Sequence, residues 1–148
     1  MTAEDRPHLD QINLVVHDMD AMVDFYGRLG LEVASFGPQW DQHHREVNRE
    51  RGMHFDLDSE ASLAQWNRGW PAGRTGPVIG FRVTARETVD AIHADLVAAG
   101  YASQQQPFDA FWGARYAVVT DPEGNPVGIM SESDPAMRSR PGEPPSGA

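Results

Sequence analysis

Three large aromatic rings stand within five positions of one another: Phe108, Phe111 and Trp112. Such a density of rings is typical of one wall of a hydrophobic cleft that binds a small molecule. His54 and Asp56 lie two positions apart in a segment where apolar and polar residues alternate, so their side chains point to the same side of a strand. If burial tunes their pKa values, these two residues are the candidate catalytic acid and base.

The composition excludes several other kinds of chemistry. The chain has 148 residues, about the size of one domain, and it contains no cysteine, which excludes disulfide bonds, thiolate catalysis and cysteine metal sites. Its formal net charge of −10 argues against a nucleic acid or an anionic membrane as partner. Neither a signal peptide nor a membrane-spanning apolar run is recognisable, so we expect a cytoplasmic protein.

Two stretches in the first half of the chain alternate in the manner of half-buried strands, residues 9–16 and 53–58. Between them, a helix capped by Asp18 or Asp20 is expected to precede another strand over 31–36. A short helix is expected over 59–66. The least regular segment is 37–52, which holds Trp40, His43 and His44. It is predicted to be a loop that flanks or interrupts a strand, and the role of its histidines is left open.

The second half of the chain repeats this order. Three glycines and two prolines make 69–77 a linker, after which 78–83 is predicted to be a strand and 85–99 a helix. The runs 117–119 and 127–130 read as two strands joined by a tight turn. The opening strands align with Gln11 on Val78, an offset of 78 − 11 = 67. The closing strands align with Asp56 on Gly128, an offset of 128 − 56 = 72, so the chain contains a duplicated module.

The segments WGARY, DPEGN and VGIM closely resemble the last two strands of the vicinal oxygen chelate superfamily. That superfamily includes glyoxalase I, bleomycin-resistance proteins, fosfomycin-resistance enzymes and extradiol dioxygenases. With the repeat, the resemblance covers residues 8–131. It implies an α+β fold in which two tandem βαβββ modules form an incomplete eight-stranded barrel around a cleft, with the helices outside. The expected organisation is an N-terminal arm over 1–7, a first module over 8–68, the linker 69–77, a second module over 78–131 and a flexible C-terminal tail over 132–148.

The resemblance also implies where a metal would bind. Its metalloenzymes take a His or Gln from the first strand and a Glu from the last strand of the modules. The matching positions are Gln11 and Asp56 in the first module, with His54 the nearest competitor, and Val78 and Gly128 in the second. The last two offer no donor atom, whereas a catalytic divalent metal takes three protein ligands. We therefore expect no metal cofactor.

A replacement ligand set built from the histidines is not expected either. His43 and His44 are neighbours, and adjacent side chains of an extended chain point to opposite sides, so at most one of them could join His54 at a site. These histidines are therefore predicted to lie on the surface or in a loop.

The cleft is instead predicted to be apolar and aromatic, with a few polar groups. Arg82 or Arg115 could meet an anionic substituent and Asp56 a cationic one, while Gly80 and Gly128 would enlarge the cleft. The candidate ligand-binding residues are Gln11, Asn13, Trp40, His54, Asp56, Arg82, Phe108, Phe111, Trp112, Arg115, Gly128 and Met130.

The leading hypothesis is a protein similar to glyoxalases and bleomycin-resistance proteins that has lost the usual metal ligands. It would bind a small, partly aromatic organic molecule for sequestration or for metal-independent chemistry. One alternative is a metal-dependent lyase or dioxygenase of the glyoxalase type that uses Gln11, Asp56 and an unrecognised ligand. Another is a structural or regulatory dimer without a ligand. The resemblance implies a homodimer, and whether the protein is an enzyme is left open.

Overall fold

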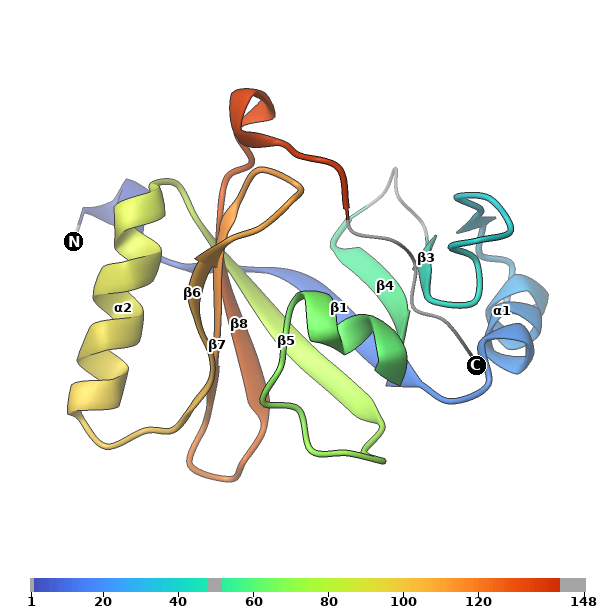
Figure 1. The fold of residues 1–148 in the computed structure, drawn as a ribbon, viewed down its shortest axis with the longest axis horizontal. Coiled ribbons are helices and arrows are strands. Elements are labelled where there is room, and N and C mark those ends of the chain that lie inside the picture. Colours follow the sequence, from blue (N-terminus) through green and yellow to red (C-terminus); the bar gives the residue numbers. More distant parts are fainter. Residues whose placement is uncertain (1, 48–51, 142–148) are drawn as a thin grey trace.

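Eight strands form one continuous sheet, with a helix packed at either end (Figure 1). The computed structural model describes residues 2–47 and 52–141. The strands are β1 (His8–Val16), β2 (Val33–Ala34), β3 (His44–Val47), β4 (His54–Ser59), β5 (Gly76–Val83), β6 (Ser103–Asp109), β7 (Arg115–Thr120) and β8 (Pro126–Ser131). The helices are α1 (Met19–Arg28) and α2 (Arg86–Ala98), with short 3-10 turns η1 (Ala3–Asp5), η2 (Glu60–Gln65) and η3 (Pro135–Met137). None of the described helices is long and apolar enough to cross a membrane.

The strand order is β2-β3-β4-β1-β5-β8-β7-β6. Strand β1 runs parallel to β4, and β5 runs parallel to β8, whereas the other neighbours are antiparallel. The order divides into two βαβββ units, joined by the central β1–β5 pair. Because β2 and β6 end the sheet and do not pair with each other, the barrel stays open. The predicted α+β fold with an incomplete eight-stranded barrel is confirmed.

The strand registers reproduce the internal repeat. Asn13 lies opposite Asp56 in the first unit, and Gly80 lies opposite Gly128 in the second. These pairs are related by 80 − 13 = 67 and 128 − 56 = 72, the same two offsets that align the sequence. The segment 37–52 contains the third strand of the first unit, β3, which pairs with both β2 and β4.

Alternation along the strands divides the core between the two faces of the sheet. On one face, Val119 joins Val83 and Ile129 in a buried cluster that packs against Val89 of α2. On the other face, Val118 packs with a different buried cluster. That cluster consists of Val15, Leu63, Trp66, Trp70, Val78 and Tyr116. The helices therefore cover the outer face, and η2 with its flanking tryptophans packs on the inner face, beside the cleft.

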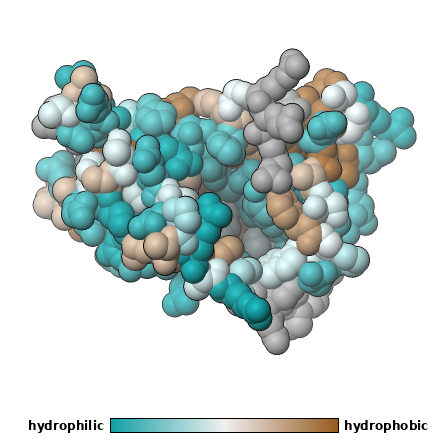
Figure 2. All heavy atoms as spheres, turned by 90° about the horizontal axis from the view of Figure 1, so that it is seen from above, coloured by the Kyte–Doolittle hydropathy of each residue, from teal (hydrophilic) through white to brown (hydrophobic). Residues whose placement is uncertain are grey.

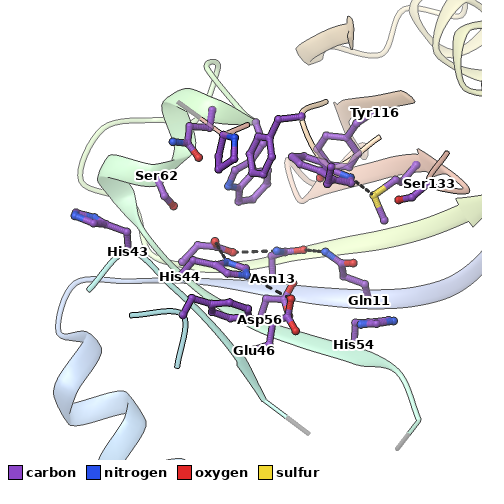
Figure 3. Close-up of a pocket in the computed structure, with 18 of the residues that line it drawn as sticks. Gln11, Asn13, His43, His44, Glu46, His54, Asp56, Ser62, Tyr116 and Ser133 are labelled. Atoms are coloured by element: carbon purple, nitrogen blue, oxygen red, sulfur yellow. Dashed lines mark hydrogen bonds and ion pairs between the residues drawn. The ribbon is translucent and has the colours of Figure 1, made fainter. Parts of the chain in front are cut away.

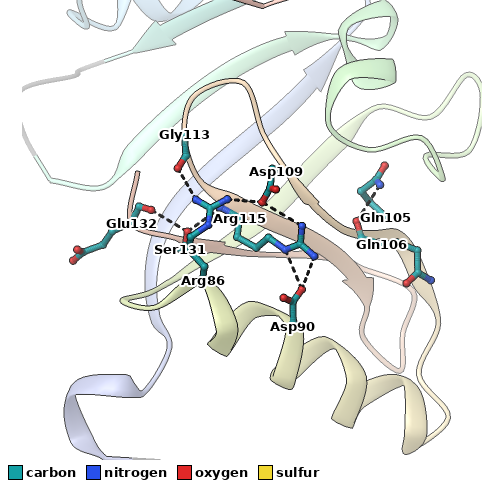
Figure 4. A network of polar contacts seen from close by, with 9 residues as sticks. All are labelled: Arg86, Asp90, Gln105, Gln106, Asp109, Gly113, Arg115, Ser131 and Glu132. Carbon is teal, nitrogen blue, oxygen red and sulfur yellow. Dashed lines mark hydrogen bonds and ion pairs between the residues drawn. The ribbon is translucent and has the colours of Figure 1, made fainter. Parts of the chain in front are cut away.

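A network of ion pairs fastens the second helix to the outer face of the sheet (Figure 4). Arg115 of β7 donates from Nε to Asp90 of α2 at 3.0 Å and from Nη1 to Asp109 at 3.2 Å. Arg86 of α2 pairs with the same Asp109 and donates to the carbonyl of Gly113 at 2.8 Å. Arg115 is therefore engaged on the helix side of the sheet.

The segment that follows β8 packs against the second unit. The amide of Asp134 donates to the carbonyl of Gly113, and the amide of Ser139 donates to the carbonyl of Phe111, both at 3.0 Å. The sequence predicts a mobile tail over 132–148 because that stretch is poor in apolar residues. Backbone hydrogen bonds, which need no apolar side chain, nevertheless hold the segment between Glu132 and Ser139. The rest of the predicted tail, 142–148, lies outside the described residues.

We predict that Gly113→Ala loosens this segment. Gly113 has φ +95°, and a Cβ atom there would collide with the carbonyl oxygen of Asp134. Gly124→Ala is the matched control, because Gly124 has φ +85° but open space around its Cβ position. Each variant loses about 1–2 kcal/mol of unfolding free energy to backbone strain. Only Gly113→Ala should lose more, and only that variant should speed hydrogen exchange at the Ser139 amide. Equal exchange in the two variants would contradict the expectation.

Candidate functional site

A cavity of about 620 Å³ opens on the inner face of the sheet. Seen from above, the molecule is mainly hydrophilic and is hollowed near the centre of this face (Figure 2). Nine predicted site residues line the cavity: Gln11, Asn13, Trp40, His54, Asp56, Arg82, Phe111, Trp112 and Met130. Three do not: Phe108, Arg115 and Gly128.

The three exceptions have separate physical reasons. Phe108 packs edge-on against Tyr116, with 6.1 Å between ring centroids, and so supports the aromatic wall from behind. Arg115 pairs with acids on the outer face. A Cβ atom on Gly128 would lie 2.6 Å from the hydroxyl oxygen of Tyr116. The missing side chain therefore does not enlarge the cleft as predicted, because Tyr116 occupies that space.

Sequence reasoning missed a set of polar residues that line the cavity from β3 and β4. They are His44, Glu46 and Asp58. Residues 44–47 do alternate, with Val47 buried on the opposite face from Glu46, but the surrounding charges hid the pattern. The internal repeat could have revealed this strand. The offset of 72 aligns Glu46 with Val118, which lies in a predicted strand, and so predicts a strand around Glu46 as well.

Pairing of the strands gathers these side chains in one place (Figure 3). Asp56 of β4 lies between Asn13 of β1 and Glu46 of β3 in the register. His44 lies opposite Asp58, two residues along each strand and therefore on the same face. Three acidic side chains and one imidazole thus share one wall of the cavity.

Hydrogen bonds hold the middle of this cluster. Asp58 is 3% exposed, and its two oxygens bond Nδ1 of His44 at 2.8 Å and Nδ2 of Asn13 at 2.9 Å. Gln11 donates in turn to Oδ1 of Asn13 at 2.5 Å. Nε2 of His44 faces Glu46, with 3.8 Å between it and Oε1. Asp58 therefore orients the ring and leaves Nε2 turned towards the neighbouring carboxylate.

The electrostatics of the cleft shift the pKa values of two groups. Burial alone lowers the pKa of His44, but hydrogen bonds to Asp58 and Glu46 and the charges of Asp58 and Asp56 outweigh it and raise the pKa to about 10. Burial raises the pKa of Tyr116, and the charges of the same two aspartates raise it further. His44 is therefore cationic and Tyr116 a neutral phenol at ordinary pH.

Aromatic side chains form the opposite wall. In Figure 3, Tyr116 lies across the cavity from His44 and Glu46. The ring of Tyr116 lies 5.8 Å from that of Trp112 and 6.1 Å from that of Trp66, measured between centroids. The indole Nε1 of Trp112 donates to the sulfur of Met130 at 3.2 Å. One side of the cavity is therefore charged and the other is apolar.

The four positions at which the resemblance implies metal ligands do not fit a metal. Gln11 and Asp56 reach the cavity, but Val78 is fully buried in the core and the space beside Gly128 is filled. A different donor set is present, because ligand atoms of His44, Glu46 and Asp56 all lie within 4.8 Å of one another. The expected absence of a metal cofactor is therefore not supported.

The two histidines of the 37–52 segment lie in different kinds of structure. His44 is a strand residue on the cavity wall, where it joins the polar cluster. His43 is buried at the edge of the cavity, and its Nδ1 bonds the hydroxyl of Ser59 at 3.0 Å. The prediction of a surface or loop residue was wrong for His44, because it was made without knowing that β3 pairs with β4. His43 does lie in the turn before β3, although it is buried there.

Residues 8–129 match the model of the Glyoxalase/Bleomycin resistance protein/Dioxygenase superfamily. The chain belongs to this superfamily. Its members include the vicinal oxygen chelate proteins to which the sequence was likened, so the resemblance is confirmed. No curated protein sequence is similar enough to count as a match.

Solved structures of the superfamily share the fold. Methylmalonyl-CoA epimerase from Streptomyces coelicolor is 22% identical, with a TM-score of 0.54, and the match covers 85% of this chain and 97% of the epimerase. A Mn(II)-bound glyoxalase from Novosphingobium aromaticivorans is 19% identical, with a TM-score of 0.59, and the match covers 85% of this chain and 40% of the glyoxalase. An extradiol ring-cleaving dioxygenase from B. fuscum is 20% identical, with a TM-score of 0.60, and the match covers 90% of this chain and 35% of the dioxygenase. This chain thus spans less than half of the latter two, and all three likenesses concern the fold.

We predict that Gly128→Ala disturbs the aromatic wall of this superfamily member. The added methyl group would press on the buried ring of Tyr116, and overpacking of this kind costs about 1–3 kcal/mol. Gly27→Ala in α1 is the control, because it has open space and should gain about 0.5–1 kcal/mol. Urea unfolding of both variants measures the difference. Unchanged stability of Gly128→Ala would show that Tyr116 does not fill the site.

A second prediction concerns the protonation of His44. Because its pKa is raised from 6.5 to about 10, the stabilisation by its charge is complete below about pH 6.5 and is lost as the pH rises through about 10. Asp58→Asn should lower the pKa of His44, whereas Asp90→Asn on the outer face should not. NMR of the imidazole nitrogens in metal-free protein follows the titration. A midpoint near 6.5 in the unmodified protein would refute the prediction.

Proposed function

We propose that the cleft binds a small, partly aromatic organic molecule, either to sequester it or to act on it. The observation that carries this proposal is the cavity of about 620 Å³ with one charged wall and one aromatic wall. Its volume lies within the range of small-molecule sites, which combine apolar surface with a few convergent polar groups. The superfamily is compatible with this role, although its fold alone does not select a ligand.

The aromatic wall supplies the main contact area of the proposed complex. Phe111 stands edge-on to Trp112 with centroids 5.1 Å apart, and Trp112 is itself edge-on to Tyr116. A flat ring that stacked in this corner would gain about 0.5–1.5 kcal/mol from each favourable aromatic pair beyond the burial of its surface. The hydroxyl of Tyr116 keeps its proton and can donate a hydrogen bond to the ligand.

The charged wall favours a positive or hydrogen-bond-donating group at the other end of the ligand. Glu46, Asp56 and Asp58 outnumber the single positive charge of His44. Arg82, predicted to meet an anionic substituent, already makes two bonds to Asp10, at 3.0 Å and 2.9 Å. The ligand class that fits both walls is an aromatic compound that carries an amine or a similar donor.

We also expect the protein to act as a cytoplasmic homodimer. Within residues 2–47 and 52–141, the end strands β2 and β6 each pair with one strand only. Phe25 of α1 and Leu29, directly after α1, are 60% and 65% exposed. Sedimentation at micromolar concentration tests the dimer.

The binding proposal is tested by thermal shift in EDTA-treated protein, with aromatic amines, the matching aromatic acids and the neutral parent compounds. A true ligand at 100 times its Kd stabilises the native state by about 2.7 kcal/mol. The amines should raise the melting temperature most, and Trp112→Ala should abolish the shift. Tyr101→Ala, at an exposed aromatic residue outside the cavity lining, is the control and should keep the shift. Absence of any shift across the three series would favour the alternative of a structural dimer without a ligand.

A further inference from the structure

We propose that His44, Glu46 and Asp56 bind a divalent metal ion inside the first module. This position differs from the one that the resemblance implies, where donors from both modules would surround the metal. The inference goes beyond the proposed function, because an organic ligand could occupy the cleft with or without a metal.

The backbone brings the three donors together without any long side-chain excursion. Glu46 and Asp56 are direct partners in the antiparallel β3–β4 pair, and His44 precedes Glu46 by two residues on the same face. Their ligand atoms lie within 4.8 Å of one another. Metal–ligand bonds of about 2.0–2.2 Å place two donors on one ion at most about 4.4 Å apart. Small rotations of these side chains therefore suffice to close the set.

The ring of His44 is already oriented for coordination through Nε2. Its Nδ1 bonds Asp58 at 2.8 Å, and Asp58 is itself fixed by the amide of Asn13. A carboxylate on the far nitrogen is the usual partner of a metal-binding histidine, since it sets the tautomer and the ring orientation. Asp58 is thus assigned as a positioning residue for this site.

The donors face a cavity with room for a further ligand. Three protein ligands with open positions are the arrangement of catalytic metal sites, whereas structural sites are closed by a fourth protein ligand. One imidazole and two carboxylates suit first-row divalent ions such as Mn²⁺, Fe²⁺, Co²⁺ or Zn²⁺. Such an ion supplies Lewis-acid activation of an oxygen atom on a bound molecule.

The second module contains no copy of this donor set. By the offset of 72 residues, the counterparts of His44, Glu46 and Asp56 are Tyr116, Val118 and Gly128. A single ion per chain is therefore expected, at the charged wall of the first module.

The test measures metal binding directly. The full chain is stripped with EDTA and titrated with Mn²⁺ and Co²⁺. Bound metal is measured by equilibrium dialysis with mass spectrometry, and the visible absorption of Co²⁺ reports its coordination. The expected stoichiometry is one ion per chain. Glu46→Gln and His44→Gln should each abolish stoichiometric binding, and Asp58→Asn should lower the affinity about 10–100-fold while one ion still binds at saturation.

Controls separate this inference from its rivals. Glu123→Gln, in an exposed turn far from the cavity, should bind metal as the unmodified protein does. Circular dichroism and urea unfolding verify that each variant is folded. If either Glu46→Gln or His44→Gln does not fold, metal binding by the other variant decides the test. Binding that survives both Glu46→Gln and His44→Gln overturns the proposal, as does binding well below one ion per chain. Because the ligand screen uses EDTA-treated protein, failure of metal binding leaves its result intact, and the reverse also holds.

Discussion

The cleft depends on an electrostatic constraint imposed by the β3–β4 pair. Pairing in this register forces Glu46, Asp56 and Asp58 onto one partly buried wall, where like charges repel and desolvation penalises each of them. In the metal-free protein, the protonated imidazole of His44 offsets part of this cost, and the amide of Asn13 satisfies one oxygen of Asp58. A divalent ion would replace the proton as the compensating charge, so proton and metal compete for the same place.

Duplication of one module has produced a cleft with two unlike walls. Equivalent backbone positions carry His44 and Glu46 in the first module but Tyr116 and Val118 in the second. The strand pairing at these positions is the same in both modules, whereas the side chains are charged in the first module and apolar or aromatic in the second. Within the second module, the ring of Tyr116 on β7 fills the space that Gly128 leaves empty on the neighbouring strand β8.

The superfamily fold sets where chemistry can occur without deciding which chemistry it is. An epimerase, a glyoxalase and a dioxygenase share this arrangement of strands with the chain at similar TM-scores. What differs among proteins with one fold is the set of side chains at the cleft positions. In this chain that set includes a histidine–carboxylate wall and the aromatic rings of Trp66, Phe111, Trp112 and Tyr116.

The sequence by itself determined the repeat, helices α1 and α2, strands β1, β4, β5, β7 and β8, and nine of the cavity residues, because alternation and turn chemistry act over a few neighbouring residues. Only the tertiary structure decided the rest. Strand β3 is four residues long and rich in charge, so no local pattern predicts it. Its pairing with β4 is what brings His44 and Glu46 close to Asp56. The orientation of the Arg115 side chain towards α2 likewise depends on Asp90, which is distant in the sequence. Contacts across a sheet depend on register, which no short stretch of sequence contains.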